Sequence, residues 1–107
     1  MLDIYPFIIQ TIAELRPFSA RISRADSNLA SQLRRAQTSI ALNVAEGMYS
    51  RGRNRQKHYH VALGSARETL ACLEVAVALG YTRSLEPHLE ARFNRIIGTL
   101  VKLADKP

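Results

Sequence analysis

Hydrophobic residues recur every three or four positions along most of the chain, which is the spacing of one face of an α-helix. One run extends from Leu29 to Gly47 and a second from Tyr59 to Gly80. Two more cover Asp3 to Phe18 and the residues that follow Ser84. No segment alternates convincingly between hydrophobic and polar residues as a half-buried strand does. The pattern predicts an all-α protein, an antiparallel up-and-down four-helix bundle with short connections.

Glycine, proline and small polar residues mark the expected helix ends. The second helix begins near residues 26–28, where side-chain oxygens can cap free amides, and ends at Gly47. Gly80 can take the left-handed conformation that closes the third helix. Pro87 fits the first turn of the last helix, where an amide proton is dispensable. Pro17 lies inside the first pattern and should kink or end that helix.

Length and composition bound the class of protein. The 107 residues, of which 47% are hydrophobic and 22% charged, suit one globular domain spanning residues 1–107. The single cysteine, Cys72, cannot form an internal disulfide, which suits a reducing cytoplasm. No hydrophobic run reaches the roughly 18 residues of a membrane span, and no basic segment precedes the first one. We therefore expect a soluble cytoplasmic protein.

The formal charge of +6 is concentrated in the middle of the chain. Residues 16–67 hold ten Arg or Lys residues but only two acids, Asp26 and Glu46, for a local charge of +8. A field of this sign favours RNA, DNA or an acidic protein surface as partner.

The densest basic segment directly follows Gly47, and we expect it to form a loop that leads into the third helix. Tyr49 and Tyr59 flank it, so phosphates could bind the cations while unpaired bases stack on the tyrosines. The alternative is a solvated loop, with Tyr59 a core residue. A second candidate patch is Arg34 and Arg35, which are also explained as exposed helix positions. The candidate nucleic-acid-binding residues are Arg51, Arg53, Arg55, Lys57, Arg34 and Arg35.

Ser39, Asn43 and Glu46 form a polar stripe on the second helix, because their spacing of four and three places them on one edge. A catalytic carboxylate would need a partner that the sequence does not supply. We therefore interpret the stripe as a hydrogen-bonded seam in which Asn43 fixes the helix register and Glu46 pairs with a cation such as Arg51 or Arg67.

No catalytic or metal-binding set is predicted. His58 and His60 are two positions apart and diverge on a helix, so they cannot hold one metal from the same face. We expect no cofactor and no enzymatic activity.

Large hydrophobic residues also lie away from the core stripes of the two middle helices. These are Leu42, Val75 and Leu79. An exposed second stripe favours a contact between copies of the chain. The alternative is a helix back face with scattered surface alanines, which is common.

Three blocks of the sequence carry a family resemblance: QLRRAQTSIALNVAEG at residues 32–47, LGSARETL at 63–70 and LGY at 79–81. They resemble a four-helix-bundle family that includes proteins encoded in intervening sequences of 23S ribosomal RNA genes. The family is related to the accessory variability determinant that works with a reverse transcriptase in diversity-generating retroelements. The match covers nearly the whole chain, and Ser-Ile-x-x-Asn-[Ile/Val]-Ala-Glu-Gly is its specific motif.

The resemblance implies a homo-oligomeric ring, commonly a pentamer, with a basic surface and no enzymatic activity. For the retroelement branch it also implies binding to a reverse transcriptase and to nucleic acid. The matching positions are interpreted as packing and assembly residues: Ser39, Ile40, Asn43, Val44, Ala45, Glu46, Gly47, Gly64, Ser65 and Glu68. The segment MYSRGRNRQKHYH after Gly47 is longer and more basic than is usual in the family.

Two hypotheses follow. The first is a non-enzymatic accessory protein whose oligomeric basic ring binds RNA or single-stranded DNA. The second is an interaction or assembly module whose basic face docks an acidic protein.

Overall fold

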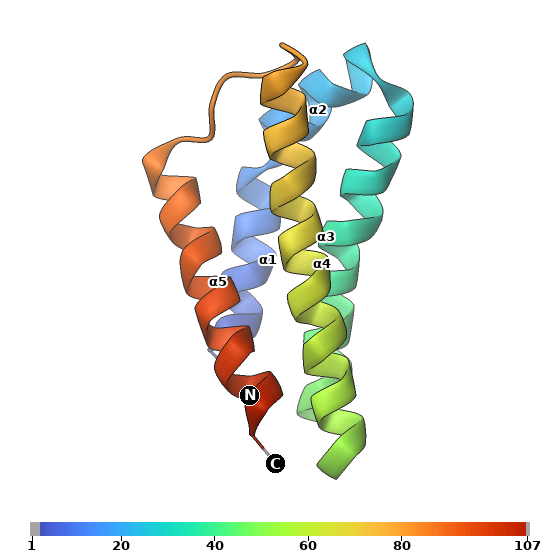
Figure 1. Cartoon of the computed structure of the whole chain (residues 1–107), viewed down its shortest axis with the longest axis vertical. Helices are drawn as coiled ribbons and strands as arrows, with labels where there is room; N and C mark the ends of the chain where they lie inside the picture. The colour runs from blue at the N-terminus through green and yellow to red at the C-terminus, as the bar shows by residue number, and fades with distance from the viewer. Residues whose placement is uncertain (1–2, 107) are drawn as a thin grey trace.

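The computed structural model describes residues 3–106, and these form five helices with no strand among them. The helices are α1 (Ile4–Glu14), α2 (Arg16–Ala25), α3 (Ser27–Met48), α4 (Gly52–Ala78) and α5 (Pro87–Asp105). The chain runs up through α1 and α2, down α3, up α4 and down α5 in a bundle of 42 × 25 × 19 Å (Figure 1). The predicted all-α antiparallel bundle is confirmed, and its first helix is divided into α1 and α2.

The division between α1 and α2 follows from Pro17, as predicted. A proline has no amide proton, so the carbonyl four residues earlier, that of Ala13, loses its helical donor. The side chain of Arg16 replaces this donor, with its Nε 3.3 Å from the Ala13 carbonyl oxygen. Leu15, between the two helices, is fully buried and keeps the broken helix on the core.

Buried side chains come from every helix and form two clusters along the bundle. One cluster is centred on Ile8, Ile40, Val44, Ala66, Ile96 and Leu100, and the other on Leu15, Ile22, Leu33, Leu73, Leu89 and Phe93. Most of these are the hydrophobic positions that the three- and four-residue spacing predicted. None of the helices within residues 3–106 has the length and hydrophobicity that crossing a membrane would require.

The upper end of the bundle is fixed by hydrogen bonds at two helix ends. Asp26 caps α3, with its Oδ1 2.9 Å from the Leu29 amide nitrogen, as the sequence predicted. Gly80 has a φ of 80° and closes α4, since its amide donates to the Val77 carbonyl and that of Tyr81 to the Ala76 carbonyl. The Tyr81 hydroxyl lies 3.2 Å from Asp26 Oδ2, so the end of α4 is tied to the start of α3.

Candidate nucleic-acid interface

The basic segment after Gly47 is helical, so the prediction of a long basic loop was wrong. Residues 49–51 alone connect α3 to α4. Gly52 begins α4 with a φ of +59°, a conformation that glycine adopts without strain, and reverses the chain there. Arg, Gln and Lys dominate the residues that follow, and all three are strong helix formers. Arg53, Arg55 and Lys57 therefore lie in the first turns of α4.

Arg55 has a structural role that the sequence did not reveal. Its Nε lies 2.8 Å from the Ser50 carbonyl oxygen and 3.2 Å from that of Gly47. Carbonyls at a helix C-terminus lack helical donors and carry partial negative charge. Ser50 contributes as well, because its hydroxyl donates to the Glu46 carbonyl over 2.8 Å. The predicted binding residue Arg55 thus caps the end of α3.

Three other cations in this segment have unused donors. The side chains of Arg51, Arg53 and Lys57 are exposed and make no hydrogen bond or ion pair with any residue from 3 to 106. Tyr49 beside them is 86% exposed, whereas Tyr59 is only 4% exposed and belongs to the core. One of the two flanking tyrosines is therefore free to stack on a base.

The C-terminal end of α5 adds to this positive surface. Gln56 Nε2 donates to the Ala104 carbonyl oxygen over 3.2 Å, which places the start of α4 beside the end of α5. The same end of the bundle, the lower one in Figure 1, thus carries six cations, here called the basic end: Arg51, Arg53, Arg55, Lys57, Lys102 and Lys106. Three exposed acids also lie there, Asp3, Glu46 and Asp105, and no ion pair joins them to these cations.

Arg34 and Arg35 lie apart from the basic end. Both are exposed on α3, where they border a shallow depression with Leu42. Fourteen residues separate Arg35 from Tyr49, about 21 Å along a helix that rises about 1.5 Å per residue. The structure does not bring the two predicted patches together.

The polar stripe of α3 forms a hydrogen-bonded seam with α4, as predicted for Ser39 and Asn43. Asn43 Nδ2 lies 2.9 Å from the Ser39 carbonyl oxygen, and Ser65 Oγ lies 2.7 Å from Ser39 Oγ. His58 Nδ1 lies 3.0 Å from Asn43 Oδ1. We call Ser39, Asn43, His58 and Ser65 the polar seam, since each of them forms a hydrogen bond with another of the four.

Glu46 departs from the predicted seam. Its side chain is exposed, and within residues 3–106 it makes neither an ion pair nor a hydrogen bond, so the predicted pairing with Arg51 or Arg67 is wrong. Arg55, just across the turn, is already bonded to the carbonyls of Gly47 and Ser50. The described part of the chain also contains no group of three or more His, Cys, Asp or Glu side chains placed to hold a metal ion.

Gly47 lies inside α3, which continues to Met48, at a point where α3 and the Tyr59 ring of α4 pack closely. A Cβ built on Gly47 would lie 2.5 Å from Cε1 of the Tyr59 ring. The Tyr59 ring therefore packs against the Gly47 backbone more closely than a residue with a Cβ would allow. Burial raises the pKa of the Tyr59 hydroxyl, while the charge of Arg55 acts in the opposite direction.

The residues predicted for assembly differ in their exposure to solvent. Leu42, Val75 and Leu79 are 59%, 45% and 56% exposed, so their hydrophobic surface is unused in the single chain. Gly64 is exposed with open space above it, whereas Ser65 is buried in the polar seam. The sequence pattern missed Val61, a further exposed hydrophobic residue on α4.

Fold and surface together define an all-helical bundle protein with one basic end and an internal polar seam. Comparison with known proteins agrees with this class and narrows it. Residues 9–102 match the model of the 23S rRNA-intervening sequence protein family. The chain belongs to that family.

A crystal structure from Bacteroides thetaiotaomicron shares the fold. It is described as a protein with unknown function from the S23 ribosomal protein family. The two chains superimpose with a TM-score of 0.80 over 96% of this chain and 99% of the other, at 18% sequence identity. No curated protein matches the chain.

Proposed function

We propose that this protein is a non-enzymatic nucleic-acid-binding protein that holds single-stranded RNA or DNA at its basic end. The observation that carries the proposal is the group of free donors on Arg51, Arg53 and Lys57 beside the exposed ring of Tyr49. Cations that have no internal partner can bind phosphates, and an exposed tyrosine can stack on an unpaired base.

A role without catalysis is supported by the polar seam. The His58 ring bonds to the Asn43 amide, and the two serine hydroxyls bond to each other, so these bonds do not pair a serine nucleophile with the histidine base. Self-association, in a ring or otherwise, is supported by the exposed Leu42, Val75 and Leu79. Several copies would present several basic ends, and avidity would strengthen a weak single site.

The direct test is fluorescence anisotropy with a labelled single-stranded RNA at several salt concentrations. The affinity should fall as salt rises, because bound cations displace counterions from the phosphates. The double variant Arg53→Gln/Lys57→Gln removes two contacts, so the slope of log K against log salt should become shallower by about 1.4. Tyr49→Ser should weaken binding without changing that slope.

The matched control is Arg34→Gln/Arg35→Gln, which removes the same charge from a helix surface elsewhere on the bundle. Its salt slope should equal that of the wild type. A loss of RNA binding in this variant, with the basic-end variant unaffected, would assign the site to Arg34 and Arg35. If the wild type binds neither RNA nor single-stranded DNA, the basic end is better explained as a docking surface for an acidic protein.

A further inference from the structure

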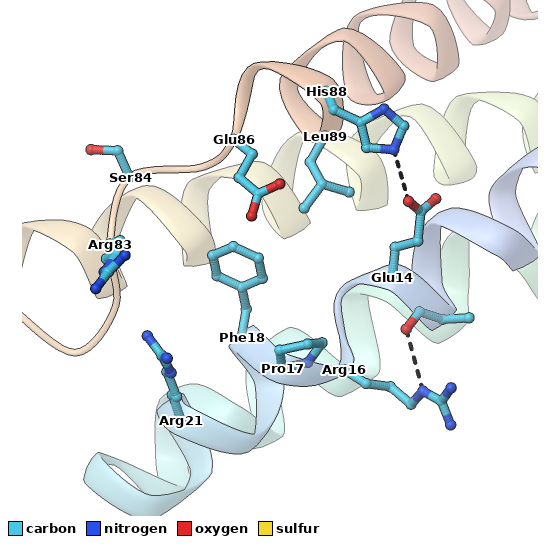
Figure 2. Close-up of a pocket in the computed structure, with 11 residues that line it drawn as sticks. Glu14, Arg16, Pro17, Phe18, Arg21, Arg83, Ser84, Glu86, His88 and Leu89 are labelled. Carbon is cyan, nitrogen blue, oxygen red and sulfur yellow. Dashed lines mark hydrogen bonds and ion pairs between the residues drawn. The ribbon is translucent and has the colours of Figure 1, made fainter.

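A cavity at the upper end of the bundle has a chemistry that differs from the basic end. It lies where the α1–α2 break faces the connection between α4 and α5, and its volume is about 720 Å³. Ligand pockets of about 300–1,000 Å³ accommodate small organic molecules. The cavity is therefore large enough for a ligand of nucleotide size (Figure 2).

Two arginines give this cavity an unbalanced positive charge. Arg21 from α2 and Arg83 from the α4–α5 connection lie on the same side, with their guanidinium groups turned toward each other in Figure 2. Neither guanidinium group makes a hydrogen bond or ion pair within the described residues. Two like charges that converge without an acid bound between them favour an anion, and a guanidinium binds phosphate through two parallel hydrogen bonds.

The acidic residues of the cavity cancel only part of this charge. Glu14 is already bound, since its Oε1 lies 2.8 Å from His88 Nε2 and its Oε2 lies 3.2 Å from Arg92 Nε. Glu86 is exposed, points into the cavity in Figure 2 and makes no ion pair or hydrogen bond. Its carboxylate can accept hydrogen bonds from hydroxyl or amino groups of a ligand that also carries a phosphate.

The floor of the cavity is apolar. Phe18, Pro17 and Leu89 line it, and the Phe18 ring points into the space in Figure 2. Phe18 is only half-buried, because it packs on the upper core cluster and still borders the cavity. An aromatic ring partly open to a cavity can stack on a flat ligand ring.

From this arrangement we propose that the cavity binds a nucleoside monophosphate. Arg21 and Arg83 hold the phosphate, Phe18 contacts the base, and the Glu86 carboxylate accepts hydrogen bonds from the sugar. The site lies at the opposite end of the bundle from the basic end, so it does not depend on the function proposed above. The ligand has two possible sources, a free nucleotide or the phosphorylated terminal nucleotide of a single strand, and both present the same chemistry.

The test is a titration of the full chain with AMP and with UMP, followed by the NMR signals of the protein. Binding should shift the signals of residues around Phe18 and Arg83. Arg21→Gln and Arg83→Gln should each weaken binding about tenfold, the effect of losing one charge-assisted phosphate contact. Arg24→Gln is the matched control, because it removes an exposed arginine from the same helix outside the cavity and should leave the affinity unchanged.

Three results would overturn the proposal: no binding at millimolar nucleotide, an affinity that survives both cavity variants, or an equal loss with Arg24→Gln. Phe18→Leu tests the base contact and should weaken AMP binding more than binding of inorganic phosphate. If phosphate alone binds as tightly as the nucleotide, the base and sugar contacts are wrong. The thermal midpoint of each variant confirms that the bundle is folded during the titration.

The source of the ligand is decided in the Arg53→Gln/Lys57→Gln background, where the basic end is weakened. A 5′-phosphorylated oligonucleotide that binds more tightly than UMP, and loses this advantage with Arg83→Gln, identifies a strand terminus. If UMP binds more tightly than the oligonucleotide, the ligand is a free nucleotide. A failure of this site leaves the salt dependence at the basic end unaffected, so the two proposals fail separately.

Discussion

The polar seam and the basic end are neighbours on the α3–α4 hairpin, and both are built from polar side chains, but they use these side chains in different ways. In the seam, the Ser39 hydroxyl accepts hydrogen bonds from Asn43 on its own helix and from Ser65 on α4. At the basic end, Arg53 and Lys57 point to solvent without a partner within residues 3–106. A polar side chain that has a partner inside the bundle stabilises the fold, whereas one without such a partner is available for binding.

Substitutions in the polar seam and at the basic end should differ in their effects on stability and on RNA binding. Leaving a buried polar group without its partner costs about 1–3 kcal/mol, whereas an exposed charge contributes at most about 1 kcal/mol to stability. Substitutions in the seam should therefore lower stability and leave RNA binding intact. Substitutions at the basic end should do the reverse.

The largest effect is expected at Gly47, which lies between the two regions. In Gly47→Val, the new side chain meets the Tyr59 ring, where even a Cβ would be 2.5 Å from a ring carbon. Overpacking of this kind costs about 3 kcal/mol, and chemical denaturation should show the loss as a lower midpoint. Gly64→Val is the control, since open space surrounds that glycine, and its midpoint should change little. Equal losses in both variants would mean that helix propensity, not contact with Tyr59, determines the result.

A smaller loss is expected in the seam. Asn43→Ala removes the acceptor of His58 and the donor to Ser39, all half-buried, so we expect a destabilisation of about 1–2 kcal/mol. Thr38→Ala, at an exposed position on the same helix, should stay within about 0.5 kcal/mol of the wild type. RNA affinity should be unchanged in both variants. If a folded Asn43→Ala protein binds RNA more weakly, the RNA interface includes the polar seam, and its role is not purely structural.

Much of the fold could be predicted from the sequence because burial follows helical spacing. The hydrophobic runs of the sequence contain residues that the core buries, such as Ile40, Leu73 and Phe93, and Pro17 predicted the break in the first helix. The start of α4 was misplaced, because a glycine can either end a helix or begin one. Gly52 begins a helix here, which converts most of the expected loop into its first turns.

The candidate site was predicted less completely. The spacing of Ser39 and Asn43 indicated a shared edge, but the pairing with His58 and Ser65 depends on how α3 and α4 align, which the periodicity of one helix does not contain. The upper cavity joins Arg21 to Arg83 across 62 positions, and no local pattern connects them. Charge along the chain likewise could not distinguish Arg55, which caps α3, from its neighbours.

The smallest and most discriminating prediction concerns Arg55 and Arg53, two arginines of the same basic segment. Arg55→Ala removes hydrogen bonds to the Gly47 and Ser50 carbonyls, so we expect a loss of about 1 kcal/mol in the free energy of unfolding. Arg53→Ala should change it by less than about 0.5 kcal/mol, because its side chain is exposed and makes no internal contact of this kind. RNA affinity should follow the opposite order, since the charge of Arg55 is already balanced by carbonyl dipoles. If both substitutions weaken RNA binding equally and leave the stability unchanged, Arg55 is a binding residue like Arg53. The proposed role of Arg55 as the cap of α3 is then wrong.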